Sequence, residues 1–297
     1  MINIYYTKTS MWEYDFFVND IFNKNLYNTE IKFTLFDKNT KIVKNDYKNI
    51  IVFNNKNSLK QVQNMIHILK PKVVFHLSDE YGQDHKYYDL YSKYNNILVF
   101  HQYNHNNITY NYDIQFQIPL AYVSCYCDDK SSLDIELSGD KQYDFSYVGM
   151  LKKDRKEMLD KFAKEFTKNY VHTGKTNWAN PQNQEIKPLE VYDIYNKSIF
   201  VPIGRGNKSL DCSRLYESIL AGAIPVMCCS QEELTDSYKF NGNLPQIISA
   251  ETWDKAIILC KDIYHDEIKK NDIIQYNLKW WKEQIMDISF KINNQFI

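Results

Sequence analysis

Three side chains in the second half of the chain, Arg205, Arg214 and Glu217, have types and spacing suited to nucleotide binding. An arginine guanidinium can hold a phosphate group through two parallel hydrogen bonds. A glutamate carboxylate can accept hydrogen bonds from two neighbouring hydroxyl groups, such as those of a ribose. Arg214 and Glu217 are three residues apart, so they would share one face of a helix. The same spacing also allows a simple ion pair on a helix surface.

The strand and loop that would position these side chains come immediately before them. Residues 199–203 form an apolar run, which predicts a strand buried on both faces, and Pro202 leaves the end of that strand ambiguous. Gly204 and Gly206 enclose Arg205 in a predicted turn, and glycines let the backbone approach a ligand closely. This arrangement favours a ligand that is held against the backbone at the end of a strand.

A helix is predicted to follow this turn. Ser209 or Asp211 can cap it, Ser213 falls near its start, and Ala221 ends it before Gly222, which suits the left-handed conformation after a helix. A helix N-terminus offers free N–H groups and a partial positive charge to an anion. Strand, glycine loop and helix together predict a phosphate-binding site.

These residues resemble a known signature. Gly-Arg-Gly at 204–206, followed by Ser-Arg-Leu-Tyr-Glu-Ser-Ile-Leu-Ala-Gly-Ala-Ile-Pro-Val at 213–226, is similar to the donor-site motif of the exostosin family of glycosyltransferases. The resemblance extends more weakly to Gly149 and to residues 244–248. It implies an α/β fold of GT-B architecture, with two Rossmann-like, doubly wound domains that face each other across a cleft. It also implies a uridine diphosphate-sugar as the donor and an inverting reaction.

The predicted donor-binding residues lie in this motif and at strand ends of the same domain. Residues 170–173 form a predicted strand, so side chains near its end are placed to line the site. The full predicted set is Gly149, His172, Thr173, Gly174, Gly204, Arg205, Gly206, Ser209, Ser213, Arg214 and Glu217.

A second resemblance concerns the first half of the chain. His-Leu-Ser-Asp-Glu at 76–80, Val-Phe-His-Gln-Tyr at 99–103 and Ile-Pro-Leu-Ala-Tyr at 118–122 are similar to the N-terminal half of the subgroup that includes the ribitol xylosyltransferases. The chain departs from that pattern at His101, where arginine is expected, and at Ala121, where glycine is usual. The resemblance implies an acceptor-binding domain here and favours xylose as the transferred sugar.

Three residues in this half are candidates for a general base, which sugar transfer needs within hydrogen-bond reach of the acceptor hydroxyl. Asp79 and Glu80 follow a predicted strand at 73–77, and His101 follows another at 97–100. Ligands bind beyond the carboxyl ends of such strands in parallel sheets, which predicts Asp79, Glu80 and His101 as catalytic residues. The alternatives are a helix cap for Asp79 and a hydrogen-bonded loop position for His101.

The spacing of strands and helices indicates doubly wound parallel sheets in two domains, at 1–125 and 140–271. The polar stretch 124–141 is expected to be an interdomain linker and surface loop. A helix at 272–290 packs in a core, lies on a membrane surface, or crosses back to the first domain, and the resemblance favours the last. Further strands are predicted at 2–6, 31–36, 49–53, 114–118 and 143–148, and further helices at 12–26, 59–69, 153–166, 188–195 and 251–264.

Composition narrows the class of partner. The 297 residues carry a formal net charge of -1, which disfavours a nucleic-acid partner. The charged run at 152–157 is typical of a solvated helix face. The six cysteines show no paired zinc-site spacing, so reduced thiols are expected. No signal peptide or apolar run near the ~20 residues of a membrane span is found, which predicts a cytoplasmic protein. Abundant Tyr, Asn, Lys and Ile suggest an A/T-rich genome, perhaps of a virus or bacterium.

The sequence therefore predicts a glycosyltransferase that moves a sugar from a nucleotide diphosphate-sugar to a hydroxyl of a glycan or glycoprotein. No Asp-x-Asp element is present, and Asp128 and Asp129 fall in the expected linker, so the chemistry is predicted to need neither metal nor cofactor. Two alternatives stay open. One is a nucleotide-sugar epimerase of the same fold, and the other is a non-catalytic nucleotide-sugar-binding protein.

Overall fold

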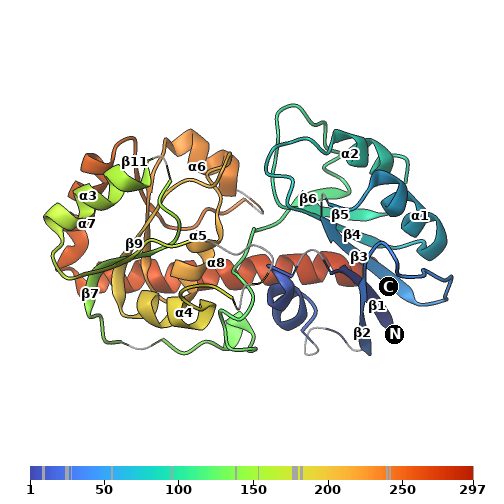
Figure 1. Cartoon of the computed structure of the whole chain (residues 1–297), viewed down its shortest axis with the longest axis horizontal. Helices are drawn as coiled ribbons and strands as arrows, with labels where there is room; N and C mark the ends of the chain where they lie inside the picture. The colour runs from blue at the N-terminus through green and yellow to red at the C-terminus, as the bar shows by residue number, and fades with distance from the viewer. Residues whose placement is uncertain are drawn as a thin grey trace. The chain divides into compact units, whose positions relative to one another are not determined.

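The chain forms two compact α/β units, Met1–Pro119 with Gln284–Ile297 and Leu120–Glu283 (Figure 1). The computed structural model describes residues 1–8, 11–23, 27, 29–54, 56–94, 96–137, 139–152, 154–175, 180, 183–238, 240 and 242–296. Each unit is built on a parallel sheet with helices on its faces, which confirms the predicted α/β fold class.

The first unit contains a six-stranded sheet in the order β2-β1-β3-β4-β5-β6. Four of its strands, Ile2–Thr7, Lys48–Asn54, Val73–Leu77 and Leu98–His101, are almost fully buried and rich in β-branched and aromatic residues, as parallel sheets require. The edge strand Ile31–Phe36 is only partly buried. The strands are β1 (Ile2–Thr7), β2 (Ile31–Phe36), β3 (Lys48–Asn54), β4 (Val73–Leu77), β5 (Leu98–His101) and β6 (Gln115–Gln117).

Helices α1 (Leu59–Leu69) and α2 (His85–Tyr91) share one core with the strands of this sheet. Ser58 caps α1 as predicted, because its Oγ accepts a hydrogen bond of 3.2 Å from Gln61 N. The apolar face of α1 is buried against the sheet, as its periodicity predicts. The helix expected at 12–26 is instead a six-residue π-helix, Phe16–Ile21, whose Phe17 packs edge-on against Phe75 of β4. Aromatic packing has overridden the expected longer helix, although residues 24–26 lie outside the described residues.

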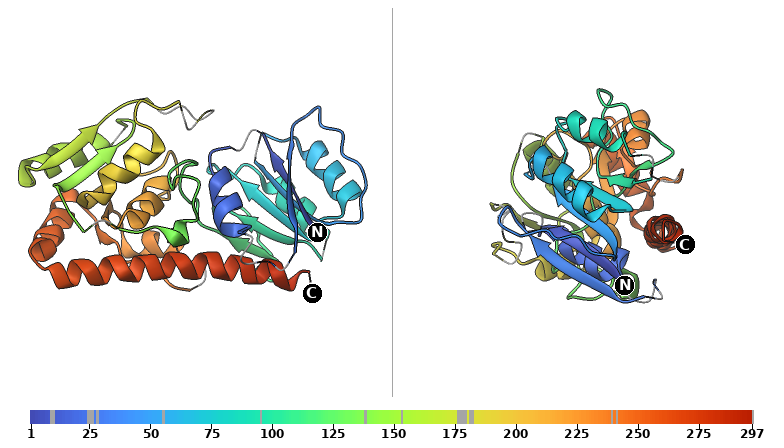
Figure 2. Two further views of the ribbon diagram at one scale, coloured as in Figure 1. Left: turned by 90° about the horizontal axis from the view of Figure 1, so that it is seen from below. Right: turned by 90° about the vertical axis from the view of Figure 1, so that its right-hand side faces the viewer.

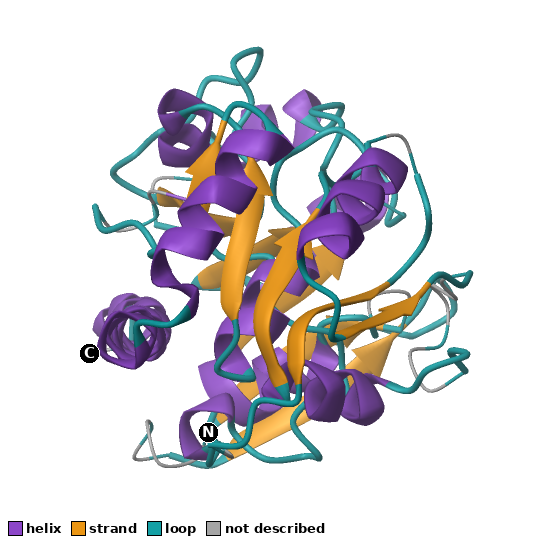
Figure 3. Ribbon diagram, turned by 90° about the vertical axis from the view of Figure 1, so that its left-hand side faces the viewer, coloured by secondary structure: helices purple, strands orange, loops and turns teal. Residues whose placement is uncertain are grey.

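The second unit contains a five-stranded sheet in the order β11-β10-β9-β7-β8. Helices α3 and α7 share a core with one face of this sheet, and α5 packs on β9 and β10. Figure 3 shows strands flanked by helices. The strands are β7 (Tyr143–Val148), β8 (Asn169–His172), β9 (Ser198–Ile203), β10 (Ile224–Cys228) and β11 (Ile248–Ala250). The helices are α3 (Arg155–Glu165), α4 (Pro188–Asn196), α5 (Ser213–Leu220), α6 (Gln231–Tyr238) and α7 (Trp253–Tyr264).

The strands of the two sheets follow the same order, counted from the first strand of each unit. In the first, β1 lies between β2 and β3, and in the second, β7 lies between β8 and β9. The chain therefore leaves the first strand of each unit to one side and returns to its other side. Such a switch point opens a crevice at the carboxyl ends of the strands, where parallel α/β sheets bind ligands.

The last helix, α8 (Glu267–Asn294), is uninterrupted (Figure 2). Its residues up to Glu283 belong to the second unit, where Trp281 Nε1 donates to Ser132 Oγ at 2.7 Å. Its later residues belong to the first unit, where Ser289 Oγ lies 3.5 Å from the carbonyl oxygen of Ile21. No helix among the described residues is both long enough and apolar enough to cross a membrane.

The expectation that 124–141 is an interdomain linker is wrong, because the stretch belongs to the second unit, and only part of it, including the exposed residues 128–130, is a surface loop. Tyr126 is fully buried, and its hydroxyl donates a hydrogen bond of 2.6 Å to the carbonyl oxygen of Glu217. Ser131 caps a short 3-10 helix, Ser132–Asp134. The first residue of this helix, Ser132, is the one that accepts the hydrogen bond from Trp281. The segment has a polar composition because it makes turns, yet it packs as part of the second unit.

Candidate functional site

Arg214 is held at the carboxyl end of β7. Its Nε donates a hydrogen bond of 2.9 Å to the carbonyl oxygen of Val148, and its guanidinium lies 5.3 Å from the centre of the Tyr147 ring. A Cβ at Gly149 would overlap this guanidinium, and the φ of Gly149 is +155°. Only glycine therefore allows the arginine to lie against the backbone at the switch point of the second unit.

Helix α5 brings Arg214 to this position without the cap that was predicted. The N-cap is Cys212 and not Ser209 or Asp211, and its side chain makes no capping hydrogen bond. Asp211 Oδ2 instead accepts from the Tyr216 hydroxyl at 3.0 Å, and Ser209 Oγ accepts from Asp211 N at 3.0 Å. These polar groups order the loop before the helix rather than its first turn. Ser213, the first residue of α5, is half-buried.

Glu217 lies one turn further along α5. It is 6% exposed, and its Oε1 accepts a hydrogen bond of 3.3 Å from Val123 N. Burial raises the pKa of this carboxyl to about 7, while the positive charge of Arg214 opposes the rise. The alternative of an ion pair on a helix surface is therefore wrong for this carboxylate.

Arg155 connects two loops at this edge of the sheet. The sequence does not predict this role, because the charged run at 152–157 is typical of a solvated helix face. Arg155 is 4% exposed, and its guanidinium donates to the carbonyl oxygens of Met150 at 2.8 Å and Arg205 at 2.6 Å. A Cβ at Gly204 would overlap its side chain. Arg155 thus ties the loop after β7 to the loop after β9. The sequence offered no signal for its burial, because the neighbouring charged residues of that run carry no apolar pattern.

Arg205 already has an anionic partner. Its guanidinium makes a two-pronged ion pair with Glu233 of α6, and both side chains are partly exposed. Gly206 beside it is half-buried. A phosphate bound by Arg205 would therefore share or replace the Glu233 carboxylate.

The end of β8 contributes at the same edge of the sheet. His172 O accepts from Gly149 N at 3.1 Å, and His172 Nε2 lies 3.1 Å from Glu185 Oε2. A Cβ at Gly174 would meet the end of the Glu185 side chain, which is exposed enough to move aside. Thr173 between them is exposed. The predicted donor-binding residues from three strand ends are therefore brought to one edge of the second unit.

In the first unit, Asp79 closes the turn before α2. Its Oδ1 accepts from Gln83 N at 2.9 Å and its Oδ2 from Asp84 N at 3.4 Å, and the residue is 3% exposed. Burial and the nearby Asp84 charge raise its pKa. Asp79 therefore orders the turn before α2, but the N-cap of that helix is Asp84, so the capping alternative is wrong. Glu80, its neighbour, is only half-buried.

His101 is buried at the end of β5. Its ring stacks on Tyr110 with the centres 4.4 Å apart, and Nδ1 lies 3.0 Å from the carbonyl oxygen of Tyr103. That carbonyl can only accept, so Nδ1 carries the proton and Nε2 does not. Within the described residues, Nε2 has no hydrogen-bond partner. Burial lowers the pKa of His101 to about 3, so the ring is neutral near pH 7.

One group of side chains in this unit has a donor set that could hold a divalent cation. Ligand atoms of His76, Asp79 and Asp84 lie within 4.8 Å of one another, and all three residues are buried. His76 Nε2 is 2.7 Å from Asp84 Oδ2, and His76 Nδ1 is 3.1 Å from the Tyr91 hydroxyl. Because these atoms and those of Asp79 already have protein partners, the group is complete as a hydrogen-bonded cluster.

Glu13, Gln102 and Ser78 form a second polar network at the carboxyl edge of the first sheet. Gln102 Oε1 accepts from Ser78 N at 2.7 Å, and Gln102 Nε2 donates to Glu13 Oε1 at 3.4 Å. Ser78 has a φ of +68°, which is unfavourable for a side-chain-bearing residue. The three residues follow β1, β4 and β5, so the network spans much of that edge.

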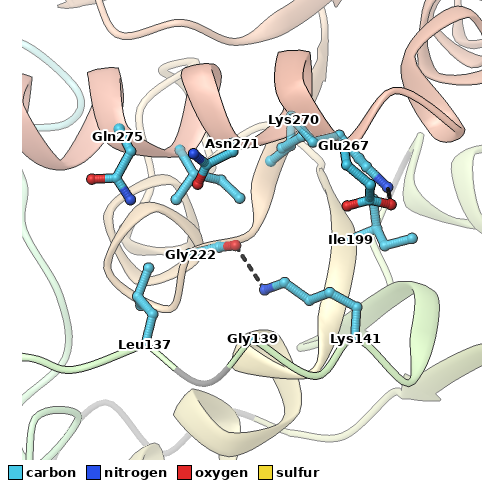
Figure 4. A pocket seen from close by; sticks show the side chains of 11 residues that line it. Leu137, Gly139, Lys141, Ile199, Gly222, Glu267, Lys270, Asn271 and Gln275 are labelled. Atoms are coloured by element: carbon cyan, nitrogen blue, oxygen red, sulfur yellow. Dashed lines mark hydrogen bonds and ion pairs between the residues drawn. The ribbon is translucent and has the colours of Figure 1, made fainter.

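A cavity lies at the opposite edge of the second sheet, near the amino ends of β9 and β10 (Figure 4). Lys141 Nζ donates to the carbonyl oxygens of Gly222 and Asn196, at 2.8 Å each. Burial, followed by the charge of Lys270, lowers the pKa of Lys141 to about 8. The residues that line this cavity are different from the predicted donor-binding residues. They are Leu137, Gly139, Lys141, Ile199, Gly222, Ile224, Glu267, Lys270, Asn271, Ile274 and Gln275.

Comparison with known proteins finds solved structures of similar fold but no matching sequence family. No protein-family model matches the chain, and no curated protein sequence matches it. The fold is similar to that of Anabaena HepE, solved in complex with UDP and glucose, with a TM-score of 0.52 and 11% identity over 100% of this chain and 99% of that chain.

Two further solved structures are similar over 99% of this chain. They are an O-GlcNAc transferase variant of Thermobaculum terrenum (TM-score 0.48, 7% identity, 66% of that chain) and the UDP-GlcNAc 2-epimerase of Neisseria meningitidis bound to UDP-GlcNAc (TM-score 0.46, 9% identity, 98% of that chain). The likeness to HepE extends over the whole of both parallel sheets, and it agrees with the predicted two-domain α/β architecture of the GT-B type.

Proposed function

We propose that this protein is a glycosyltransferase that binds a uridine diphosphate-sugar on its second unit. The observation that carries the proposal is the arginine at the switch point. Arg214 lies against the backbone at Gly149, where a side chain would exclude it, and Glu217 lies on the next turn of the same helix. A guanidinium for the diphosphate and a carboxylate for the ribose suit one nucleotide.

The chemistry follows from the charge that develops during transfer. As the bond between the sugar and the diphosphate breaks, negative charge grows on the diphosphate and has to be stabilised. The Arg214 guanidinium and the N-terminus of α5 are fixed, positive groups that serve this purpose without reorganisation. These positive groups favour a metal-independent transfer to a glycan hydroxyl. The resemblance to the exostosin family implies that the transfer is inverting, and the resemblance to the ribitol xylosyltransferases favours xylose as the sugar.

The fold supports a nucleotide-sugar substrate. HepE, whose fold is similar, was solved with UDP and glucose, and the present chain has arginine, glycine and glutamate at the carboxyl edge of its second sheet. The two alternatives differ in product. An epimerase would change the sugar without an acceptor, and a binding protein would leave the donor intact.

The test is a panel of UDP-sugars incubated with purified protein and analysed for released UDP and for sugar transferred to candidate glycans. We expect the wild type to release UDP from at least one donor. In Arg214→Ala, the rate of this UDP release should fall by at least ten-fold. Lys255→Ala, an exposed substitution on α7, serves as the control and should keep full activity. An altered free nucleotide-sugar would favour the epimerase, and unchanged donors across the panel would contradict the transferase.

Metal independence gives a second prediction. Because Arg214 and α5 supply the positive charge, excess chelator should leave UDP release within about two-fold of the untreated rate. The measurement is the initial rate before and after dialysis against chelator. Complete loss that manganese restores would show that a metal neutralises the diphosphate.

A further inference from the structure

The loop after β1 holds a carboxyl group at the switch point of the first unit. β1 takes the same place in its sheet as β7 takes in the second, where the loop after the strand positions Arg214. Glu13 lies in this loop, and the switch point is the place where a parallel sheet binds its ligand. Topology thus puts Glu13 at the ligand-binding edge of the first unit.

The neighbouring residues Gln102 and Ser78 orient the hydrogen bond that the Glu13 carboxylate accepts. Gln102 Oε1 is engaged by Ser78 N, so the amide group of Gln102 has to present N–H to Glu13. Ser78 keeps a strained φ of +68° while it makes this contact, and strain of this kind is concentrated at functional sites. The network therefore supplies one directed donor to a Glu13 oxygen, beside the hydrogen bond that the carboxylate accepts from the backbone N–H of Glu13 itself.

Glu13 is also poised to exchange a proton. It is 4% exposed, and in the part of the chain that the structure describes it has no ion-pair partner. Burial raises its pKa to about 7, with the Gln102 hydrogen bond opposing the rise. Burial and then the charge of Glu13 raise the pKa of Tyr6 of β1, and Tyr14 and Asp15, which follow Glu13 in the chain, act on Tyr6 in the same direction. A base works best when its pKa lies near the working pH.

The sequence candidates suit this role less well. Asp79 accepts backbone hydrogen bonds with both carboxylate oxygens, and His101 is buried with a pKa of about 3. Each therefore has a structural function at the same edge. Glu80, the third candidate from the sequence, is half-buried.

We propose that Glu13 is the general base that accepts the proton of the acceptor hydroxyl. The inference rests on the proposed transferase function. The hydroxyl oxygen bonds to the anomeric carbon of the sugar as the bond from that carbon to the diphosphate oxygen breaks. The electron pair of the broken bond leaves with the nucleotide diphosphate, and the hydroxyl proton passes to the Glu13 carboxylate.

The test compares Glu13→Gln and Glu13→Asp with the wild type and with Glu30→Gln, an exposed substitution in the same unit. UDP affinity is measured by calorimetry, and kcat and KM by UDP release from the UDP-sugar that the wild type uses. We expect Glu13→Gln to lose about 100-fold or more in kcat, with UDP affinity within two-fold of wild type. Glu13→Asp should recover part of the rate, and Glu30→Gln should keep it.

The pH profile separates a base from a structural residue. The wild-type rate should fall as the pH drops below about 7, because Glu13 becomes protonated, and Glu13→Gln should lack this fall. UDP binding with full turnover in Glu13→Gln would overturn the base assignment and leave the proposed function standing. Loss of UDP binding in Glu13→Gln would show a structural role and overturn it too. A wild type that binds no UDP would overturn the proposed function itself.

Discussion

At the scale of single residues, the proposed donor site depends on the contact between Gly149 and Arg214. We predict that Gly149→Ala displaces the guanidinium, because the added Cβ would overlap it and the backbone φ of +155° is unfavourable for alanine. UDP affinity should fall by ten-fold or more, and the free energy of unfolding by about 1–3 kcal/mol. Calorimetry and chemical denaturation measure the two effects.

Gly242→Ala is the matched control for this substitution. Its φ is +101°, and a Cβ there would meet no atom of the described residues within 4 Å, so alanine imposes backbone strain without a clash. The control should lose stability but keep UDP affinity. Equal UDP affinity in both variants would mean that Arg214 does not need its position against the backbone.

The buried carboxyl of Glu217 predicts a pH dependence of stability. Its pKa rises from 4.5 in the unfolded chain to about 7 in the folded protein, so folding favours the protonated form. This contribution is fully present below pH 4.5 and is lost as the pH rises through about 7, at a cost of about 3 kcal/mol. Glu217→Gln should therefore raise the free energy of unfolding at pH 8 and give little or no gain near pH 4.5. Urea denaturation at the two pH values tests this, and an equal effect at both would contradict it.

At the scale of elements, the site depends on two loops that Arg155 connects. Arg155→Ala removes hydrogen bonds to two carbonyl oxygens, and bonds to charged groups contribute about 1.5–3 kcal/mol each. We predict a loss of about 3 kcal/mol in unfolding free energy and weaker UDP binding. Lys156→Ala changes an exposed side chain on the same helix and should stay within about 0.5 kcal/mol. Matching melting curves for the two variants would rule out the bridging role.

Local pattern explains which elements the sequence predicts correctly. The helix at Leu59–Leu69 and the strands at Val73–Leu77 and Tyr143–Val148 have the predicted bounds, because cap, periodicity and apolar runs are all local. Helix α6 was not predicted, since only Leu234 and Tyr238 of its eight residues are buried. Pro202 lies within β9, the central strand of the second sheet. The residue pairs between β9 and β7 end at Phe200, so the N–H group that Pro202 lacks is not needed for pairing with β7 and its loss costs little.

Local pattern also explains which residues of the proposed sites the sequence predicts and which it does not. Arg214 and Glu217 could be found because residues three apart on a helix share a face. Arg155 and Glu13 could not be found, because a charged residue gives no apolar pattern and its burial depends on distant parts of the chain. The segment at 124–141 was misinterpreted for a related reason, since its polar turns surround the fully buried Tyr126.

At the scale of the whole molecule, two units with one strand order have different side chains at the same edge. The second presents glycines, an arginine and the start of α5, which suit a diphosphate. The first presents a carboxyl group, Glu13, within a hydrogen-bonded network. This division matches the two demands of sugar transfer, which are stabilisation of a leaving anion and removal of a proton.

The most direct test of the central claim is calorimetric titration of UDP into the wild type, Glu217→Ala and the control Lys255→Ala. The account predicts UDP binding by the wild type and the control. Binding by Glu217→Ala should be weaker by about 1.5–3 kcal/mol, the range for hydrogen bonds to charged groups. No UDP binding by the wild type, or equal affinity in Glu217→Ala, would contradict the assignment of the donor site to this edge of the second unit.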